Sequence, residues 1–361
     1  NLDIIKENNE IEYLSITSNN TFSSAVFDNK GNVVWNINSN DYVDTKYLEN
    51  GNVLTVYTEE GCSYLLEIDY LGKIYNAYKI NNHLHHTFYE FKNKYVLITY
   101  SEDGFNRNDL IYIIDKNDGK LLKKVDLYEI LSKYSEKFKH EKQTDEDWAH
   151  INSLYLNEKD NEIIVSLRKS NSIISINYKT NKINYIINSS NYFDDNFKDL
   201  IIKPNFDMLS QHSVYINENG EFVIFNNNVN RIKHLIDSVE VYDDNKESYP
   251  AIFNVDKENK KANLIWKYTY KNKKLFAPAF SSFEILKNGN KLINYSCMIE
   301  PENGKYLFEN QYMKIVILNS KDEIIFEAKK KDSVINVYHI KIYENYKNQN
   351  KNIEAKIMEV K

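Results

Sequence analysis

The stretch from Tyr215 to Phe225, YINENGEFVIF, indicates the fold of the whole chain. Apolar residues alternate on both sides of an Asn-Gly pair, which is the strongest short-range signal for a β-hairpin because its tight turn needs positive φ at both central residues. The pattern recurs clearly in two other segments, and with altered turns in two more. These segments are KYLENGNVLTVY (46–57), FEILKNGNKLINY (283–295), FYEFKNKYVLITY (88–100) and LYLNEKDNEIIVSL (154–167).

A second pattern alternates with the first: an apolar strand, a polar turn and another strand. Radial repetition of four-stranded units leaves only short, protected sheet edges, so the two patterns together predict an all-β fold, a six-bladed β-propeller with four-stranded blades and little helix. A pair of β-sandwiches is the competing fold, and it fits matched hairpin pairs less well. The six copies, spaced on average by about sixty residues, lie at 25–35, 66–80, 111–127, 174–187, 252–268 and 315–328.

The domain organisation that follows is a lead-in segment, residues 1–20, and a single propeller domain, residues 21–361. The best helix candidate is LYEILSKYSEKF (127–138), where apolar residues recur at spacings of three and four, and we expect it in a loop between blades. No apolar run approaches the roughly 18 residues of a membrane span. The start at Asn1 rather than at a methionine is compatible with a cleaved leader.

Composition limits the classes of partner. A formal net charge of −6 argues against nucleic acid, because a surface that follows a phosphate backbone needs clustered lysine and arginine. Arginine occurs only as Arg107, Arg168 and Arg231, so each is a candidate for a role that needs a planar fork of donors. Cys62 and Cys297 form neither a metal-binding spacing nor a disulfide framework, and they leave the redox compartment open.

Three histidines occupy one position of the hairpin repeat. His86, His150 and His212 each stand seven residues before an asparagine of their hairpin, and Ser281 has the same offset in a fourth hairpin. Equivalent positions of different blades converge around the central channel, so we expect these side chains to meet there. A half-buried histidine bonded to a neighbouring strand would explain one of them, but chance rarely places three of the eight histidines at one repeat position.

The surroundings of His150 indicate an anion site. Asn152 lies two residues further along, on the same side of a strand, and Arg168 follows on the strand across the hairpin. Neutral and charged donors can surround a tetrahedral anion, and arginine can bind two oxygens at once, so the cluster suits a sulfate, phosphate or carboxylate. A three-histidine metal site is the alternative. No carboxylate stands in register with the histidines, so we expect neither a metal nor another cofactor.

Several motifs together resemble the bacterial arylsulfate sulfotransferases, from about residue 25 to residue 343. They are LHHT (84–87), DWAHINS (147–153) followed by Arg168, QHSVYINENG (211–220) followed by FNNNVNR (225–231), and FSSFEILKNGN (280–290). Members of that family are six-bladed propellers that move a sulfuryl group between phenols without a nucleotide donor. Some also carry an N-terminal β-sandwich. Only about 20 residues precede the expected propeller here, which leaves open whether this protein forms a homodimer.

The resemblance implies a role for each site residue. His212 would attack the sulfur of an aryl sulfate and form a sulfohistidine, which a phenolic acceptor then discharges. His150, Asn152 and Arg168 would bind the sulfuryl oxygens. His86, rather than its neighbour His85, would be the general acid and base at the phenol oxygen. The segment of Ser281 and Ser282 would supply a hydroxyl donor, with Ser281 as the assigned residue.

The resemblance also implies export to the periplasm or the cell surface, with a small aryl sulfate and a phenol as the partners. A second function stays open, because a propeller fold does not dictate activity. The chain would then be a non-catalytic or hydrolytic propeller that binds a sulfated or other anionic ligand.

Overall fold

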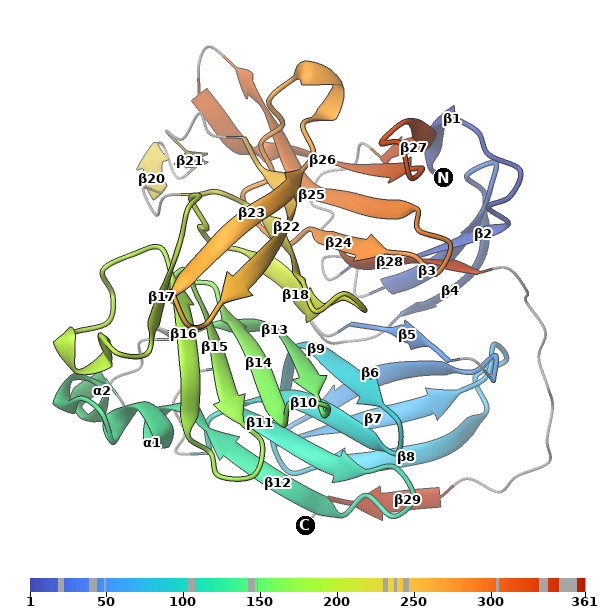
Figure 1. Cartoon of the computed structure of the whole chain (residues 1–361). Coiled ribbons are helices and arrows are strands. Elements are labelled where there is room, and N and C mark those ends of the chain that lie inside the picture. The colour runs from blue at the N-terminus through green and yellow to red at the C-terminus, as the bar shows by residue number, and fades with distance from the viewer. Residues whose placement is uncertain are drawn as a thin grey trace.

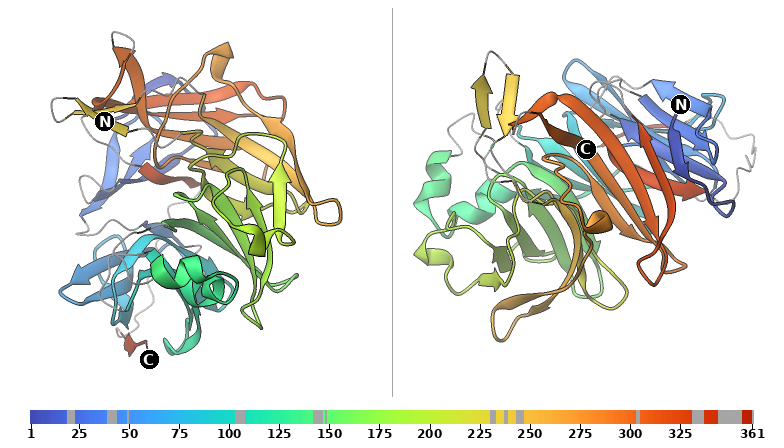
Figure 2. Two further views of the ribbon diagram at one scale, coloured as in Figure 1. Left: turned by 90° about the vertical axis from the view of Figure 1, so that its left-hand side faces the viewer. Right: turned by 90° about the horizontal axis from the view of Figure 1, so that it is seen from above.

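The computed structural model describes residues 1–18, 23–38, 44–48, 50–102, 108–141, 147, 149–229, 233–236, 239–242, 247–302, 305–330, 337–343 and 356–360. Two of the three arginines, Arg107 and Arg231, lie outside these ranges. The described chain is all-β with little helix, and its sheets have a propeller-like arrangement (Figure 1). Figure 2 shows from two further sides that the sheets stand around a common centre rather than in two stacked layers.

The described strands form five hydrogen-bonded sheets. The first contains β28 (Val337–Tyr343), β2 (Tyr13–Ser18), β3 (Ser23–Asp28) and β4 (Val33–Asn38). The second contains β29 (Lys356–Glu359), β8 (Ile74–Ile80), β7 (Cys62–Ile68), β6 (Val53–Glu59) and β5 (Lys46–Tyr47). The third contains β12 (Leu121–Asp126), β11 (Asn108–Asp115), β10 (Lys94–Tyr100) and β9 (Leu84–Phe91).

The other two sheets are larger. One has nine strands in the order β13 (Ile151–Asn157), β14 (Glu162–Leu167), β15 (Ser172–Asn177), β16 (Ile183–Asn188), β17 (Ile201–Pro204), β23 (Lys261–Lys267), β22 (Tyr249–Asp256), β19 (Phe222–Asn226) and β18 (His212–Ile216). The other joins β1 (Asp3–Lys6), β27 (Ile324–Lys330), β26 (Lys305–Leu318), β21 (Val239–Tyr242) and β20 (Lys233–Ile236), with β25 (Lys291–Glu302) on β26 and β24 (Ser282–Ile285) on β25.

Every predicted hairpin forms. The Asn-Gly pattern gives the antiparallel pairs β5–β6, β9–β10, β13–β14, β18–β19 and β24–β25. The second pattern gives β3–β4, β7–β8, β11–β12, β15–β16, β22–β23 and β26–β27. Strand alternation in the sequence was therefore a sound guide to local pairing.

The predicted geometry of the Asn-Gly turn was wrong. In the β18–β19 hairpin φ is positive at Gly220, at 80°, but not at Asn219. The Asn217 amide donates to Glu221 O at 2.9 Å and the Gly220 amide donates to Asn217 O at 3.0 Å. This is a longer loop that ends in one left-handed glycine, so only the glycine needs positive φ.

The prediction of six separate four-stranded blades also needs correction, because the hydrogen bonding groups the described strands into five sheets. The cause is β17, which pairs in parallel with β16 on one side and with β23 on the other. This strand joins two antiparallel four-stranded meanders, β13–β16 and β18, β19, β22 and β23, into the nine-stranded sheet.

Strands from the two chain ends are built into the sheets. β2 lies within the segment 1–20 that was expected to precede the propeller, and it pairs with β3 and with the C-terminal strand β28. β1 pairs with β27, and β29 pairs in parallel with β8 at the bottom of Figure 1. β1 and β2 are therefore hydrogen-bonded to strands of the propeller-like body.

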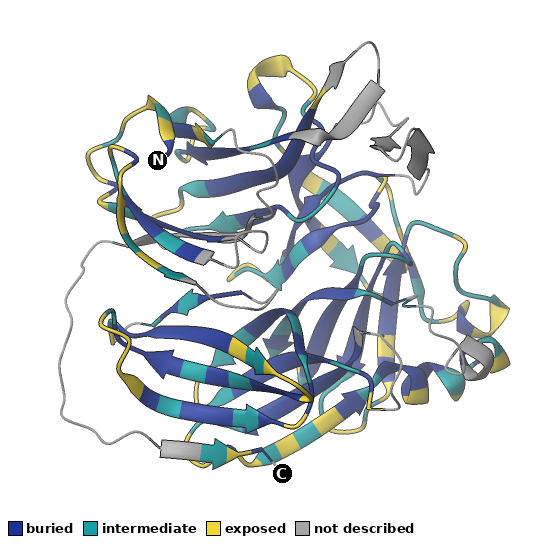
Figure 3. Cartoon of the chain, turned by 180° about the vertical axis from the view of Figure 1, so that it is seen from behind, coloured by how far each residue is buried: buried dark blue, intermediate teal, exposed yellow. Residues whose placement is uncertain are grey.

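Apolar side chains fill the spaces between neighbouring groups of strands. Figure 3 shows that much of the strands is buried and that many turns are exposed. One cluster joins β9–β12 to β13–β16, with Ile113 and Ile163 fully buried. Another lies between the two halves of the nine-stranded sheet, where Ile164 and Phe253 are fully buried. The two halves thus pack face to face although a hydrogen-bonded strand connects them.

The predicted helix at 127–138 is two short helices, α1 (Leu127–Ser132) and α2 (Glu136–Glu141), at the edge of the molecule in Figure 1. α2 begins after Ser135, whose hydroxyl accepts from the Lys137 amide at 3.3 Å, an interaction typical of a helix start. The described part of the chain also contains two single 3₁₀ turns, η1 (Asp195–Phe197) and η2 (Tyr270–Asn272). Within the described ranges no helix is long and apolar enough to cross a membrane.

Candidate active site

Hydrogen bonds between neighbouring inner strands fix their register. The Val214 amide of β18 donates to Ser153 Oγ of β13 at 3.0 Å, and the Phe283 amide of β24 donates to Ser213 Oγ of β18 at 3.1 Å. Ser153 and Ser213 therefore hold equivalent positions on successive strands. The rings of Tyr89, Tyr155 and Tyr215 follow the same register, with centroids 5.5 Å and 6.5 Å apart.

Four predicted site residues hold the same position in this register, each on a different strand. His86, Asn152, His212 and Ser281 each directly precede the hydroxyl residue of their strand: Thr87, Ser153, Ser213 and Ser282. All four are buried, with exposed fractions of 3%, 4%, 4% and 2%. These four residues therefore hold equivalent, buried positions at the heads of successive inner strands.

His150 stands two residues before this position, so its seven-residue offset from Asn157 does not mark the position that His86 and His212 hold. The asparagines used to count the offset are not equivalent: Asn93 and Asn219 lie in turns, whereas Asn157 is the last residue of β13. The equivalent of His86 and His212 on β13 is Asn152. His150 nevertheless reaches the same cluster, because its Nε2 lies 2.8 Å from His86 Nε2.

Left-handed backbone conformations stand at the heads of these strands. φ is 56° at His86, 47° at His150, 55° at Ser213 and 75° at Ser281. Non-glycine residues rarely adopt such values, and they persist only where surrounding contacts hold them. The β9–β10, β13–β14 and β18–β19 pairings shift register in the same places. These bulges aim side chains that a regular strand would place differently.

The tautomer of His212 follows from its neighbours. Asn227 Nδ2 donates to the backbone carbonyls of Ala277 at 2.7 Å and Phe280 at 3.1 Å, so its Oδ1 faces His212. His212 Nδ1 lies 2.7 Å from this Oδ1 and 3.0 Å from Ser210 O. Both partners only accept, so Nδ1 carries the proton and Nε2 keeps its lone pair. Burial, reinforced by the charge of Arg168, lowers the pKa of His212 to about 3.

His86 and His150 form the second part of the cluster. Burial lowers the pKa of both rings, that of His86 well below its ordinary value. His150 Nδ1 lies 2.6 Å from Asp147 Oδ2. His85, the alternative acid and base, packs edge to face against His86 with ring centroids 4.0 Å apart, and burial lowers its pKa to about 3. All these imidazoles are therefore neutral near pH 7 in the absence of an anion.

Arg168 follows β14, and its backbone amide donates to His150 O at 3.2 Å. Its positive charge lowers the pKa of His86, His150 and His212, so the guanidinium lies within electrostatic reach of all three rings. Cys297 is near as well. Burial raises the pKa of its thiol to about 12, and Arg168 opposes this rise. A cation beside neutral rings that can donate hydrogen bonds suits an anionic ligand.

Asn152 and Ser281 have backbone partners at the site. Asn152 Nδ2 donates to Gln211 O at 2.7 Å, which ties the head of β13 to the residue before His212. Ser281 Oγ accepts from the Ser296 amide at 3.0 Å. Both side chains therefore position the strand heads in this structure.

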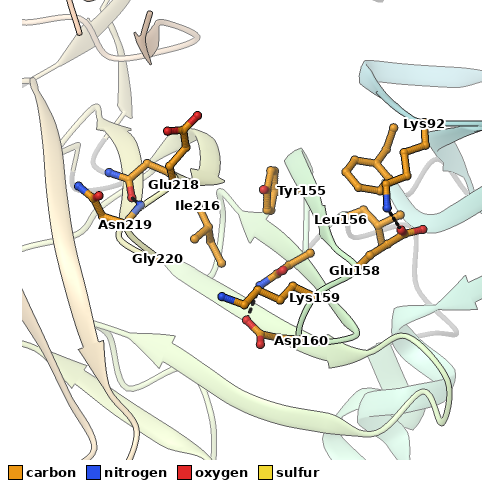
Figure 4. A pocket seen from close by; sticks show the side chains of 13 residues that line it. Lys92, Tyr155, Leu156, Glu158, Lys159, Asp160, Ile216, Glu218, Asn219 and Gly220 are labelled. Carbon is orange, nitrogen blue, oxygen red and sulfur yellow. Dashed lines mark hydrogen bonds and ion pairs between the residues drawn. The ribbon is translucent and has the colours of Figure 1, made fainter. Parts of the chain in front are cut away.

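A cavity of about 580 Å³ lies at the other end of the inner strands, between the β9–β10, β13–β14 and β18–β19 turns (Figure 4). Lys92, Glu158, Lys159, Asp160 and Glu218 give it a mixed charge, and the Lys92–Glu158 ion pair measures 2.7 Å. A strand rises about 3.3 Å per residue, so Glu158 is roughly 20 Å from Asn152 along β13. None of the six predicted site residues lines this cavity.

Comparison with known proteins identifies the family. A model of the family described as Arylsulfotransferase (ASST) matches residues 5–350, nearly the whole chain. The chain belongs to the arylsulfotransferase family. The resemblance predicted from the histidine motifs is confirmed, and membership supports aryl sulfotransferase activity in general.

One solved structure supports the fold. A protein of unknown function from Bacteroides caccae is 12% identical, with a TM-score of 0.56, and the match covers 91% of this chain and 98% of that one. The β-propeller domain of Cps50 (Swd1) from Myceliophteria thermophila is 9% identical, with a TM-score of 0.48, over 92% of this chain and 88% of that one. No curated protein sequence matches the chain.

The sequence prediction missed two residues at the site, Asp147 and Asn227. Both lie in motifs that carried the family resemblance: Asp147 opens DWAHINS and Asn227 lies within FNNNVNR. The spacing of residues along the strands indicated no role for Asp147 or Asn227. Each contacts its histidine, His150 or His212, from a loop position rather than from a strand. Among the described residues, no group of three or more His, Cys, Asp or Glu side chains is placed to hold a metal ion.

Proposed function

We propose that the protein transfers a sulfuryl group from an aryl sulfate ester to a phenolic acceptor through a sulfohistidine at His212. In the first step His212 Nε2 attacks the sulfur, an N–S bond forms, and the bond between sulfur and the aryl oxygen breaks. In the second step the acceptor oxygen attacks the same sulfur and the N–S bond breaks. The covalent intermediate divides one difficult transfer into two easier ones.

The observation that carries this proposal is the tautomer of His212. A nucleophilic imidazole must be neutral and must present a nitrogen lone pair. Asn227 and Ser210 hold the proton on Nδ1, and burial keeps the pKa of the ring low. A site that only binds an anion gains nothing from a histidine held in this form, since a neutral ring attracts an anion less than a charged one.

Arg168 supports the choice of a sulfuryl group. An aryl sulfate carries one negative charge on three oxygens, and arginine can bind two oxygens at once. Charge also builds up on the leaving phenolate oxygen, where a preorganised donor stabilises the transition state. We assign sulfuryl binding to Arg168 and Asn152, and proton transfer at the phenol oxygen to His86. His150 was expected to bind the sulfuryl group too, but its two ring nitrogens face Asp147 and His86, so we assign it to the support of His86. Ser281 would donate its hydroxyl proton to the substrate in place of the weak bonds that it donates to Ala279 O at 3.4 Å and Ser296 O at 3.5 Å.

The number of blades and the cellular location of the protein are part of the same proposal. We propose six blades, because the nine-stranded sheet contains two four-stranded meanders that pack face to face through their own apolar cluster. In this count β17 is a connector between two blades. The family resemblance further favours a periplasmic or surface location, where aryl sulfates from outside the cell would be accessible.

The test is mass spectrometry after brief incubation with p-nitrophenyl sulfate, without acceptor, under an alkaline quench. We expect the mass of one SO₃ group on the peptide that carries His212, and its loss when a phenol is added. The His212→Asn variant should release no p-nitrophenol and carry no label. If the wild type binds the ester in a calorimeter but releases no phenol and gains no label, the protein is a binding propeller and the proposal fails.

A further inference from the structure

A line of hydrogen bonds connects a carboxylate to two histidines of the site. Asp147 Oδ2 lies 2.6 Å from His150 Nδ1, and Asp147 Oδ1 accepts from the His150 backbone amide at 3.2 Å. On the other side of the same ring, His150 Nε2 lies 2.8 Å from His86 Nε2. A hydrogen bond between two ring nitrogens holds one proton, so one Nε2 donates it and the other accepts it.

We propose that Asp147 is a positioning residue that makes His150 and His86 a two-ring proton relay for the sulfuryl transfer. This inference rests on the function proposed above. An ionised carboxylate can only accept, so Asp147 holds a proton on His150 Nδ1. His150 then exchanges protons with its surroundings through Nε2, and that nitrogen faces His86. The general acid and base is therefore the pair of rings, with His86 at the substrate end.

The relay accounts for the protons in both steps of the sulfuryl transfer. Before the first step the pair holds one extra proton: His150 is an imidazolium, and neutral His86 carries its proton on Nδ1. As the sulfur–oxygen bond breaks, His86 Nδ1 gives its proton to the leaving phenolate oxygen, and the proton between the rings moves from His150 to His86. In the second step the acceptor phenol gives its proton to His86 Nδ1, and the proton between the rings returns to His150.

Charges around the pair set when the extra proton is present. Burial disfavours the extra proton on His150, and the positive charges of Arg168 and Lys169 also lower the pKa of this ring. The negative charge of Asp147 favours the extra proton. His85 and His212 also face His86 and lower its pKa when charged. An aryl sulfate brings one negative charge, which offsets part of this effect. Protonation of the pair is therefore coupled to binding of the donor, and Asp147 supplies the fixed negative charge that makes it accessible.

The experiment compares the wild type with Asp147→Asn over aryl sulfates whose phenols differ in acidity. A good leaving group such as p-nitrophenolate needs little help from an acid, whereas phenolate itself needs much. General acid catalysis typically contributes about 10²- to 10⁴-fold. We expect less than about a tenfold loss of kcat with p-nitrophenyl sulfate and about 10²-fold or more with phenyl sulfate. Asp147→Glu should recover part of the loss, because it restores the carboxylate.

Asp28→Asn is the matched control. Asp28 caps the β3–β4 turn by accepting from the Lys30 and Asn32 amides, far from the site in the chain, and an asparagine oxygen can accept the same bonds. This variant should keep the wild-type dependence on the leaving group. An equal loss for both donors in Asp147→Asn, or no loss, would overturn the relay, because a purely structural role affects all donors alike.

A second measurement does not depend on turnover. In ¹⁵N-histidine NMR of the whole protein at neutral pH, His150 should carry its proton on Nδ1, and Asp147→Asn should weaken this preference. If the wild type transfers no sulfuryl group but His150 has the Nδ1–H form, the proposed function fails while the role of Asp147 stands. A His150 that carries its proton only on Nε2, or that is unchanged in Asp147→Asn, overturns the role of Asp147 in either case.

Discussion

Asn227 holds His212 in one tautomer: its Oδ1 lies 2.7 Å from His212 Nδ1, and its Nδ2 donates to two backbone carbonyls that prevent the amide from turning over. The carbonyls belong to the loop that leads into β24. The nucleophile proposed on β18 is thus oriented by contacts with the next group of strands, so sheet packing and chemistry are directly connected here.

Replacing Asn227 with alanine should lower kcat for aryl sulfate transfer by about 10- to 100-fold, the range seen when hydrogen-bond partners of functional histidines are removed at metal sites. Without Oδ1 the Nδ1 proton has only Ser210 O as an acceptor, so a larger share of the Nε2–H form is expected. Steady-state kinetics measures the first effect, and ¹⁵N-histidine NMR measures the second.

Asn184→Ala is the control for this variant. The Asn184 side chain also donates a hydrogen bond, to Ser175 Oγ at 3.0 Å, but it lies on β16, away from His212 in the chain. It should retain wild-type kcat. Full activity in Asn227→Ala with an unchanged His212 tautomer would show that Ser210 O alone fixes the ring.

The buried histidines should make stability depend on pH. The pKa values of His85 and His212 are about 3 in the folded protein, against about 6.5 in an unfolded chain. Between these values the unfolded chain binds protons that the folded protein does not, so the free energy of unfolding falls as pH falls from about 6.5 towards about 3. Each such group contributes up to about 1.4 kcal/mol per pH unit.

Urea unfolding at about pH 7.5 and about pH 5 tests this dependence. The wild type should be clearly less stable at the lower pH. In His212→Asn the difference should shrink, because asparagine does not titrate. An equal difference in both proteins would mean that His212 is protonated in the folded state, and it would also weaken the case for His212 as a neutral nucleophile.

A buried network of charged side chains should stabilise the sheet that contains β26 and β27. Glu327 is 2% exposed and lies 2.6 Å from both Lys314 Nζ and Tyr270 OH, and it also pairs with Lys271 at 2.8 Å. Lysine and tyrosine donors together lower the pKa of Glu327 to about 2 against the opposing effect of burial. Glu327→Ala leaves the buried Lys314 charge without its carboxylate, and we expect a loss of about 3–5 kcal/mol in the free energy of unfolding.

The matched control for Glu327 is Glu129→Ala. Glu129 pairs with Lys133 at 3.1 Å on the exposed face of α1, where removal of an ion pair should cost about 0–1 kcal/mol. Denaturant unfolding of both variants separates the two cases. A loss below about 1 kcal/mol in Glu327→Ala would mean that water reaches Lys314 when the carboxylate is removed.

The sequence predicts the structural features that depend on neighbouring residues, and it fails for those that depend on contacts between distant parts of the chain. Alternation of apolar residues specifies hairpins locally, and every predicted hairpin forms. The offset of His150 failed because hairpin length varies: Asn157 ends a strand, while its supposed equivalents lie in turns. Register between neighbouring strands depends on hydroxyl bonds such as Ser153 to Val214, which no local pattern encodes.

The same reasoning explains the other differences. β17 joins two meanders because residues far apart in the sequence meet, as Lys203 does with Lys261. The left-handed conformations of His86 and His150 depend on tertiary contacts, since only a few per cent of residues other than glycine adopt positive φ. Asp147 and Asn227 were visible as parts of motifs, but their partners became clear only from the folded geometry.

Arg168 provides a direct test of the site electrostatics. Replacement with lysine keeps a positive charge but removes the planar fork, so aryl sulfate binding should weaken less than the transfer step. We expect kcat to fall by about 10²- to 10³-fold, the usual effect of losing a preorganised donor to developing charge.

Arg168→Gln also removes the charge that lowers the pKa of His212. The pKa of His212 should therefore rise, and the acid limb of the pH–rate profile should move to higher pH. Arg168→Lys should leave that limb nearly in place. If both variants keep wild-type kcat and the wild-type profile, Arg168 does not act on the sulfuryl group, and anion binding must rest on the histidines and Asn152.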